Sequence, residues 1–348
     1  MGGRFILIPM KPSREIRIAA LAAVMLLAGC GGGSFMPGLR SLGSVVPSAT
    51  LTPNSIAVSG NYAYVTLQGT TGAVAVLNIS ANIPVPLTTF TMPCTAPNGI
   101  RISGSYLYVS CYDTGTLYVL SINNANPAAP VLSVAGSVSG LQSPYPGTSL
   151  SGSELYIPSH SGEIFRVNVS NPAAPVIDGS VATAAGTSPN AVYVAGGIVY
   201  CACSSEPSQS YFQTFTATGA MTLLGQVTLA HSPQRLVVSG NYAYVTNFDA
   251  AKLDIVDVTN PAAPGVLFSV ALPCNALPIA VTADNAYVGC YSAQGIATID
   301  ITHPAAAAVL GYTATSASPV QDLALSGAYL YAVSGNAGGS FNILSNAF

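Results

Sequence analysis

Ser59-Gly60-Asn61-Tyr62-Ala63-Tyr64-Val65 returns unchanged at residues 239–245. Weaker copies lie between and after these two stretches, and every copy holds a tyrosine at the position of Tyr64. These seven residues, which we call the anchor tyrosines, are Tyr64, Tyr108, Tyr156, Tyr200, Tyr244, Tyr287 and Tyr331. Successive anchors are 44, 48, 44, 44, 43 and 44 residues apart. The chain is therefore a tandem array of seven units of about 44 residues.

Each unit predicts four short strands. In the first unit, the apolar segments Ile56–Val58 and Tyr62–Val65 flank a Ser-Gly-Asn turn that suits positive φ. A third apolar segment follows, for example Val74–Ile79, and in three units an Asn-Pro-Ala-Ala-Pro turn comes next. A short fourth segment such as Leu224–Thr228 completes the unit. Units of this length with four strands are typical of β-propeller blades.

The order of the segments indicates a closed ring. The last unit stops after its third segment, Phe341–Ser345, whereas a fourth-strand segment, Leu42–Val46, precedes the first unit. We therefore expect the N-terminal strand to complete the last blade, which removes an exposed sheet edge. The predicted fold is all-β, a seven-bladed β-propeller of four-stranded blades.

The composition supports this fold class. Half of the 348 residues are hydrophobic, only 6% are charged, and the chain contains 34 Gly, 25 Pro and no Trp. A disordered chain would carry more charge and fewer apolar residues. A helical bundle would be rich in Glu, Lys and Arg and poor in Gly and Pro. Both classes are excluded, and one large all-β domain fits.

Two motifs resemble known propeller repeats. Residues 253–258, Leu-Asp-Ile-Val-Asp-Val, followed by Asn260-Pro261, resemble the LVIVD repeat of bacterial envelope proteins. Residues 244–247, Tyr-Val-Thr-Asn, resemble the related YVTN repeat. The resemblance covers about residues 43–348 and is weakest in the fourth unit, where Tyr211–Phe215 replaces the usual third segment. It implies a propeller with a binding or surface role and brings no catalytic residues.

The amino terminus predicts export. Basic residues within positions 1–17 precede an apolar run at 18–28, which at 11 residues is too short to span a bilayer. The run ends in Leu27-Ala28-Gly29-Cys30, which resembles the lipobox of bacterial lipoproteins and implies a lipid on Cys30; the alternative is a plain secretory signal. We expect a signal peptide at 1–29, a Gly-rich flexible tether at 30–41 and the propeller at 42–348.

The predicted location in the cell envelope and the net charge restrict which partners the protein can bind. By the same resemblance, no Asp follows Cys30, which favours the outer membrane over the inner membrane, facing either side. Removing residues 1–29 leaves 11 acidic residues and five basic ones, a net charge of −6. The basic residues are Arg40, Arg101, Arg166, Arg235 and Lys252. Five scattered cations cannot build a basic face, so we expect membrane contact through the lipid only, no nucleic-acid partner, and a monomer.

Six cysteines remain besides Cys30. Cys94 and Cys111 occupy the same places in their unit as Cys274 and Cys290, at the entry to the first strand and at the end of the second. Because these strands are antiparallel neighbours, we expect two disulfides on one face of the ring; the alternative is buried thiols. The remaining two, Cys201 and Cys203, leave three readings open: a strained bridge, free thiols or a metal pair.

No catalytic set is evident. His160 and His231 fall in loops on one face and His303 on the other, so they cannot form a three-His site. Asp257 and Asp300 should cap the turns that follow them. Asp113 and Asp249 are expected to be solvated loop carboxylates, with calcium ligation as the alternative. The arginine cluster and Asp boxes of sialidases, the Trp of quinone-dependent dehydrogenases and the carboxylate–histidine set of lactonases are lacking. We expect no catalytic residue, no metal and no cofactor.

Amide side chains mark a candidate binding site. Ten residues before five of the anchors stand Asn54, Asn98, Asn190, Gln234 and Gln321. They begin the innermost strands, so they should ring the channel mouth on the face that carries the disulfides. An amide ring can hydrogen-bond sugar hydroxyls or peptide groups; the alternative is that each amide caps its own loop. Tyr112, Phe248 and Tyr291 lie in neighbouring loops and could anchor a partner, or could pack locally.

The sequence therefore predicts a lipid-anchored envelope propeller that binds a protein, peptide or glycan without catalysis. Two other functions stay open. One is a lactonase-like hydrolase with an unrecognised channel site, and the other is a structural component of the envelope or cell surface.

Overall fold

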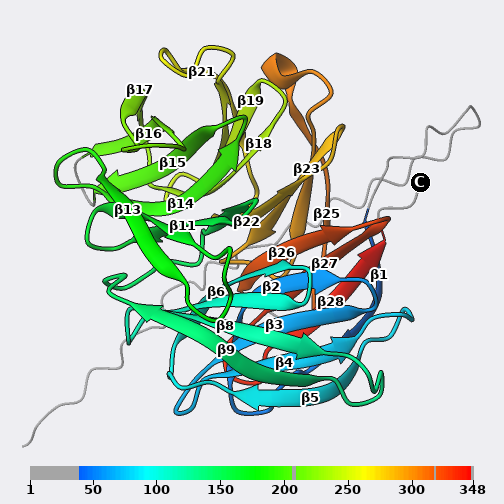
Figure 1. Cartoon of the computed structure of the whole chain (residues 1–348). Helices are drawn as coiled ribbons and strands as arrows, with labels where there is room; N and C mark the ends of the chain where they lie inside the picture. The colour runs from blue at the N-terminus through cyan, green and yellow to red at the C-terminus, as the bar shows by residue number, and fades with distance from the viewer. Residues whose placement is uncertain (1–38, 206–208, 317–318, 346–348) are drawn as a thin grey trace, which may run out of the picture. The chain divides into compact units, whose positions relative to one another are not determined.

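The computed structural model describes residues 39–205, 209–316 and 319–345. It contains seven four-stranded antiparallel sheets, arranged as the blades of a ring (Figure 1). The predicted all-β, seven-bladed propeller is thus confirmed. The described residues contain one short 3₁₀ helix, η1 (Pro304–Ala306), and no helix with the length and apolar character of a membrane span. The predicted signal peptide, Cys30 and most of the tether lie outside the described residues.

Each blade takes four strands, from the channel outwards. Blade 1 holds β2 (Thr52–Ser59), β3 (Tyr62–Gln68), β4 (Ala73–Asn78) and β5 (Val85–Thr91). Blade 2 holds β6 (Pro97–Ser103), β7 (Tyr106–Cys111), β8 (Thr116–Asn123) and β9 (Val131–Ser139). Blade 3 holds β10 (Ser149–Ser151), β11 (Glu154–Ser159), β12 (Glu163–Asn168) and β13 (Val176–Ala182). Blade 4 holds β14 (Ser188–Ala195), β15 (Ile198–Ser205), β16 (Gln209–Thr216) and β17 (Leu223–Leu229).

The other three blades follow the same order. Blade 5 holds β18 (Pro233–Ser239), β19 (Tyr242–Asn247), β20 (Lys252–Asp257) and β21 (Gly265–Ala271). Blade 6 holds β22 (Ala276–Val281), β23 (Asn285–Cys290), β24 (Ile296–Asp300) and β25 (Ala308–Thr313). Blade 7 holds β26 (Val320–Ser326), β27 (Tyr329–Ser334), β28 (Ser340–Ser345) and β1 (Arg40–Val45).

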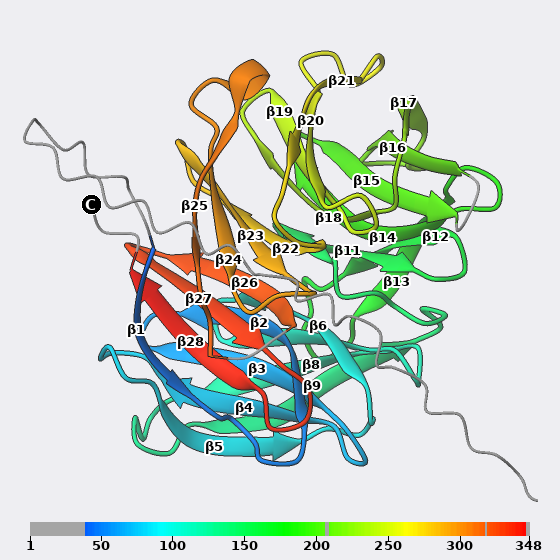
Figure 2. The ribbon, with the colours of Figure 1, turned by 180° about the vertical axis from the view of Figure 1, so that it is seen from behind.

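The N-terminal strand closes the ring, as predicted. β1 pairs antiparallel with β28, so one blade contains both ends of the described chain, which Figure 2 shows as the blue and red arrows lying side by side. β1 begins at Arg40, so its first two residues fall within the segment 30–41 that the sequence assigns to the tether. Main-chain hydrogen bonds between β1 and β28 replace the free edge that an open array would leave.

The anchor tyrosines fill the spaces between blades. All seven are buried, with exposed fractions between 1% and 6%. Tyr64 of blade 1 packs with Ile100 and Val109 of blade 2, and Tyr287 of blade 6 packs with Leu330 of blade 7. Each anchor lies on the second strand of its blade and contributes to the core shared with the next blade. The repeat therefore places the same side chain at every joint of the ring, which accounts for a tyrosine in all seven units.

One anchor hydroxyl gives a direct measure of such a joint. Tyr156 Oη donates to the backbone carbonyl of Ala217 in the next blade at 2.8 Å. We expect Tyr156→Phe to lower the free energy of unfolding by about 1 kcal/mol, the usual worth of a buried hydrogen bond. Tyr108→Phe is the matched control, because among the described residues Tyr108 Oη makes no hydrogen bond. Urea unfolding of both variants measures the difference, and equal losses would contradict the assignment.

The third strands end in side chains that cap the next turn. Asp257 Oδ1 accepts a hydrogen bond from Thr259 N, and Asp300 Oδ1 accepts one from Thr302 N, both at 2.9 Å. Asn78 and Asn168 make the same bond to the residue two positions on. The predicted capping role of Asp257 and Asp300 is confirmed. Hydrogen bonds from Thr259 and Thr302 lower the pKa of the two carboxyls.

Glycine in the fourth strands allows neighbouring blades to approach at the rim. A Cβ atom on Gly225 of β17 would lie 2.6 Å from the backbone carbonyl carbon of Ala262, in the Asn-Pro-Ala-Ala-Pro turn of blade 5. Gly136 of β9 meets the corresponding turn of blade 3 at Pro172 and Ala173 in the same way. The turns that follow the third strands of blades 3 and 5 therefore also form part of joints between blades.

Candidate functional site

Two disulfides define one face of the ring. Cys94–Cys111 joins the loop before β6 to the end of β7, and Cys274–Cys290 joins the loop before β22 to the end of β23. These are the predicted pairs. The turns between first and second strands, such as that between β2 and β3, lie at the opposite end of each blade. We call the end with the two bridges the disulfide face.

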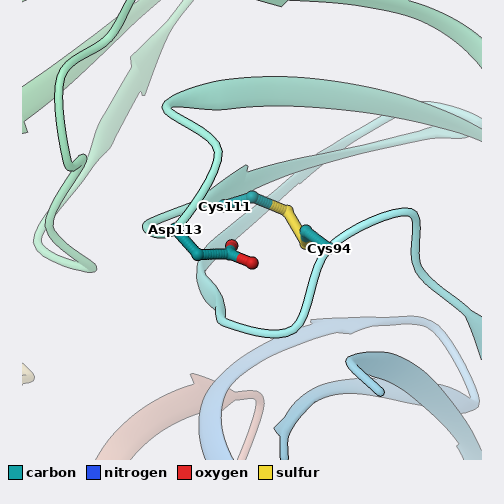
Figure 3. A group of neighbouring side chains, drawn as sticks. All are labelled: Cys94, Cys111 and Asp113. Carbon is teal, nitrogen blue, oxygen red and sulfur yellow. A yellow bond between two sulfur atoms is a disulfide. The ribbon is translucent and has the colours of Figure 1, made fainter. Parts of the chain in front are cut away.

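Asp113 supports the same pair of loops (Figure 3). Its Oδ2 atom accepts hydrogen bonds from Thr95 N at 2.9 Å and from Thr95 Oγ1 at 2.8 Å. Burial raises the pKa of Asp113, but the bonds from Thr95 and Ala96 outweigh it and leave the pKa below its ordinary value. Asp249 makes the corresponding bond to Ser232 N in blade 5. Both carboxylates are exposed in loops, as expected, and each also ties two loops together.

A carboxylate oxygen of Asp113 lies within 4.8 Å of both sulfur atoms of the Cys94–Cys111 bridge, a spacing at which three side chains could share one metal ion. A cysteine binds a metal as the thiolate, and both sulfurs here are committed to the disulfide. The donor set that remains is one carboxylate already accepting three hydrogen bonds from Thr95 and Ala96. This group therefore does not fit a metal site while the bridge is intact.

The Cys94–Cys111 bridge should contribute measurably to stability. It spans 17 residues, and the chain-entropy account gives about 3 kcal/mol for a loop of this size. We expect the double variant Cys94→Ala/Cys111→Ala to lose about that much in urea unfolding. The matched control is Cys201→Ala/Cys203→Ala, because that bridge closes a separation of only two residues and so restricts the unfolded chain far less. Equal losses for the two pairs would contradict the entropic role.

Cys201 and Cys203 form a third disulfide within β15. Residues i and i+2 of a strand share one face, so the two side chains lie side by side. Both are fully buried in the core between blades 3 and 4. The sequence left three states open for this pair, a strained disulfide, free thiols or a metal pair, and in the structure it is a disulfide.

The five predicted amides lie at breaks in the strand register. In blades 1, 2, 4, 5 and 7 the pairing of the first two strands skips the amide position, as in a β-bulge. Asn98 Nδ2 donates to the carbonyl of Pro144, and Asn190 Nδ2 donates to the carbonyl of Pro233. Each of these bonds reaches the next blade. Asn98 and Asn190, which are 9% and 5% exposed, thus have a structural role between blades.

The remaining amides are more accessible. Gln234 donates from Nε2 to Ser232 Oγ at 3.3 Å. Asn54 and Gln321 make no side-chain hydrogen bond among the described residues, and both are partly exposed. The five amides therefore fall into two groups. Asn98 and Asn190 are hydrogen-bonded to the neighbouring blade, whereas Asn54, Gln234 and Gln321 have donors and acceptors available for a ligand.

Aromatic side chains stand beside the amides. Tyr145 stacks on His160 with ring centroids 5.4 Å apart and meets the edge of Tyr112 at 6.3 Å. Phe248 and Tyr291 form a second pair at 5.0 Å between blades 5 and 6. Tyr112 and Tyr291 keep 37% and 45% of their surface exposed. Tyr145 was missed, although it lies in the Pro-Tyr-Pro stretch of the one unit that is 48 residues long.

Two cavities open between these groups on the disulfide face. One of about 310 Å³ is lined by Asn54, Gln68, Asn98, Tyr112 and Tyr145. The other, of about 350 Å³, is lined by Tyr145, His160, Asn190, Ser232 and Gln234 among others. Tyr145 therefore separates two shallow sites, each with amide groups and an aromatic wall. Such a surface can hydrogen-bond and stack on a neutral partner.

The channel holds a charged cluster that the sequence did not indicate. A cavity of about 440 Å³ is lined by first strands of all seven blades, including Arg101, Arg235 and Asp322. The sequence analysis counted these two arginines as scattered cations, and the ring brings them together. The sequence gives little sign of this cluster, because its members do not share one position of the repeat. Arg235 and Asp322 lie nine residues before their anchor tyrosines, whereas Arg101 lies seven before its anchor.

The comparisons with known proteins agree with the fold. The LVIVD repeat family model matches residues 53–80, 97–137, 148–183 and 232–271, so the chain carries LVIVD repeats, as the resemblance implied. No curated protein sequence matches the chain.

Three similar solved structures show the same architecture. BamB from Moraxella catarrhalis is 15% identical, with a TM-score of 0.54 over 84% of this chain and 81% of that one. A putative 6-phosphogluconolactonase from Bacteroides fragilis is 13% identical, with a TM-score of 0.63 over 83% and 89%. The computationally designed protein Ika8 is 13% identical, with a TM-score of 0.61 over 88% and 99%. At these identities the likeness establishes the fold.

Proposed function

We propose that this LVIVD-repeat propeller is a lipid-anchored component of the bacterial cell envelope that binds a protein, peptide or glycan on its disulfide face and catalyses no reaction. The observation that carries the proposal is the pair of cavities around Tyr145, with their amide and aromatic walls. One wall of the first cavity comes from loops that are held by the Cys94–Cys111 bridge and by Asp113. Loops fixed in this way bind with little loss of conformational entropy.

The chemistry of the face suits a neutral or polar partner. Tyr112 and Tyr291 are exposed aromatic groups, and aromatic residues often dominate the energy of binding interfaces. Asn54 and Gln234 can donate and accept hydrogen bonds without carrying charge. With a net charge of −6 after residue 29, the protein would bind through shape and hydrogen bonds rather than through electrostatic attraction to an anionic polymer.

Attachment to the membrane rests on Cys30 and the tether that follows it. We expect Cys30→Ala to abolish labelling of the protein by a palmitate analogue and to move the protein from the membrane fraction to the soluble fraction. Gly31→Ala is the control and should leave both properties unchanged. Equal labelling of Cys30→Ala and the unchanged protein would contradict the anchor. Fractionation of labelled cells would also test the proposed outer-membrane address.

A binding assay tests the proposed face. Envelope preparations are incubated with increasing amounts of purified protein, and bound protein is measured after sedimentation. We expect Tyr112→Ala/Tyr291→Ala to weaken saturable binding about tenfold or more, because loss of a hot-spot aromatic costs about 2 kcal/mol. The matched control is Tyr329→Ala, which removes a tyrosine of similar exposure, 38%, from the opposite face. Equal binding by all three proteins would contradict the assignment of the face.

The absence of catalysis is tested separately. Purified protein is incubated with a lactone and with chromogenic glycosides, and the rate is measured against substrate concentration. The proposal predicts no saturable turnover above the uncatalysed rate. Turnover that is lost in Asp322→Asn would contradict it and would support the lactonase-like alternative instead.

A further inference from the structure

The charged cluster lies in the channel, next to the cavities of the disulfide face, since Pro146 lines both the channel cavity and one of them. Arg101 lies on β6, Arg235 on β18 and Asp322 on β26, so three blades supply the charges. All three residues line the cavity of about 440 Å³. This size falls in the range of about 300–1,000 Å³ that is usual for small-molecule sites.

Asp322 is held by the neighbouring blade and not by the arginines. Its Oδ2 atom accepts from Ser55 Oγ at 2.5 Å and from Ile56 N at 3.0 Å, both in blade 1. Its Oδ1 atom accepts from the backbone N–H of Leu323 at 2.9 Å. The carboxylate thus has hydrogen-bond partners on both oxygens without an arginine.

The two arginines keep most of their donors unused. Arg101 Nη1 donates to the carbonyl of Ile100 at 2.7 Å, and Arg235 Nη1 donates to the carbonyl of Gln234 at 2.9 Å. The ion pairs recorded among the described residues are both made by Arg166. A guanidinium has five N–H donors and stays charged in proteins, so each arginine can bind an anion with its remaining donors.

The charge of the cavity is therefore unbalanced. Two guanidinium groups face one carboxylate, which leaves one positive charge uncompensated. Burial lowers the pKa of Arg101 and of Arg235, and the charge of Asp322 opposes this effect at both groups. Arg101 and Arg235 are both partly exposed to the channel, so their unused N–H groups are accessible to an anion that enters it.

The wall of the cavity offers uncharged hydrogen-bonding groups as well. The first strand of each blade is the edge of its sheet, so its inner N–H and C=O groups take no part in pairing within the blade. Some are already used, since Val192 N donates to Gly147 O across the gap between blades 3 and 4. The others are available to the hydroxyl groups of a ligand.

We propose that the channel binds a small hydroxylated monocarboxylate, of the size of a single sugar acid, with its carboxylate between Arg101 and Arg235. One negative charge matches the single excess positive charge, whereas a phosphate dianion would overcompensate it and would be repelled by Asp322. The planar fork of an arginine also matches a carboxylate in geometry. The edge groups of the seven first strands receive the hydroxyl groups. This site acts independently of the partner proposed for the disulfide face.

Calorimetric titration of the purified full chain with sodium D-glucuronate tests the site. We expect saturable one-to-one binding, no binding of D-glucose, and at least tenfold weaker binding of inorganic phosphate at equal ionic strength. Arg101→Gln and Arg235→Gln should each weaken glucuronate binding about tenfold or more, because a charge-assisted hydrogen bond is lost. Arg40→Gln, which removes an exposed arginine from β1, should leave it unchanged.

Thermal unfolding with and without glucuronate gives a second readout. Glucuronate should raise the melting temperature of the unchanged protein and should no longer raise that of Arg235→Gln, because a ligand stabilises only a protein that binds it. The proposal is overturned if glucuronate fails to bind, if D-glucose or phosphate binds as tightly, or if the arginine variants bind it as well as the Arg40→Gln control. A lower melting temperature for Arg235→Gln together with unchanged glucuronate binding would assign Arg235 a purely structural role.

Discussion

A chain that begins at Pro47, and so lacks β1, is expected to lose at least about 5 kcal/mol of unfolding free energy. β1 pairs with β28 at five positions, and each hydrogen bond lost contributes about 1 kcal/mol. Leu42 and Val45 also pack against the core between blades 7 and 1. Since natural domains are stable by only about 5–15 kcal/mol, a loss of this size should leave much of the protein unfolded. Urea unfolding and the fraction of soluble protein measure it.

The control for this truncation is a chain that begins at Leu39, which keeps all of β1. Both chains are produced in an oxidising compartment so that the disulfides form. The shorter chain should also associate, because the bared edge of β28 can pair with another molecule. If it unfolded at the same urea concentration as the control and stayed monomeric, closure of the ring by β1 would be contradicted.

Replacing Asp322 by Ala is expected to cost about 3 kcal/mol, because a hydrogen bond to a charged group contributes about 1.5–3 kcal/mol. The change leaves Arg101 and Arg235 without their only neighbouring negative charge in the cavity. It also removes the hydrogen bonds by which Asp322 joins blade 7 to Ser55 and Ile56 of blade 1. Blades 7 and 1 are therefore held together both by β1 at the rim and by Asp322 at the channel.

Asp284→Ala is the matched control, since Asp284 is an exposed carboxylate in a turn of blade 6, and such changes stay within about 0.5 kcal/mol. Asp322→Asn should fall between the two, because it keeps the shape and one acceptor but loses the charge. A ranking in which Asp322→Ala is as stable as Asp284→Ala would remove the basis for a charge relation between Asp322 and the arginines.

The fold could be predicted because its decisive features are local and repeated. One tyrosine has the same place in all seven units, and Gly-containing turns before it and Asn-Pro turns after the third strand recur in several of them. The fourth-strand segment that precedes the first unit predicted how the ring closes, and the equivalent positions of Cys94 and Cys274 in their units predicted the two disulfides. Because the other units establish the length and strand order of the repeat, the poor match of the unit that forms blade 4 did not affect the predicted number of blades.

The channel cluster could not be predicted for the same reason. Arg101, Arg235 and Asp322 are departures from the repeat, each present in one unit only, and they meet only because the ring brings distant units together. The amides stand near the starts of the first strands, as predicted, but their hydrogen-bond partners were not foreseen. Asn98 and Asn190 bond to carbonyls of the following blade, which depends on how neighbouring blades pack.

Photo-crosslinking in living cells tests whether the disulfide face is the surface that contacts the partner. A benzophenone amino acid replaces Tyr112, Tyr291 or, as the control on the opposite face, Tyr329. We expect a discrete adduct of the same partner from positions 112 and 291, none from position 329, and loss of the adduct when Asn54 and Gln234 are changed to Ala. Adducts from position 329 alone, or no adduct from either position on the disulfide face, would contradict it.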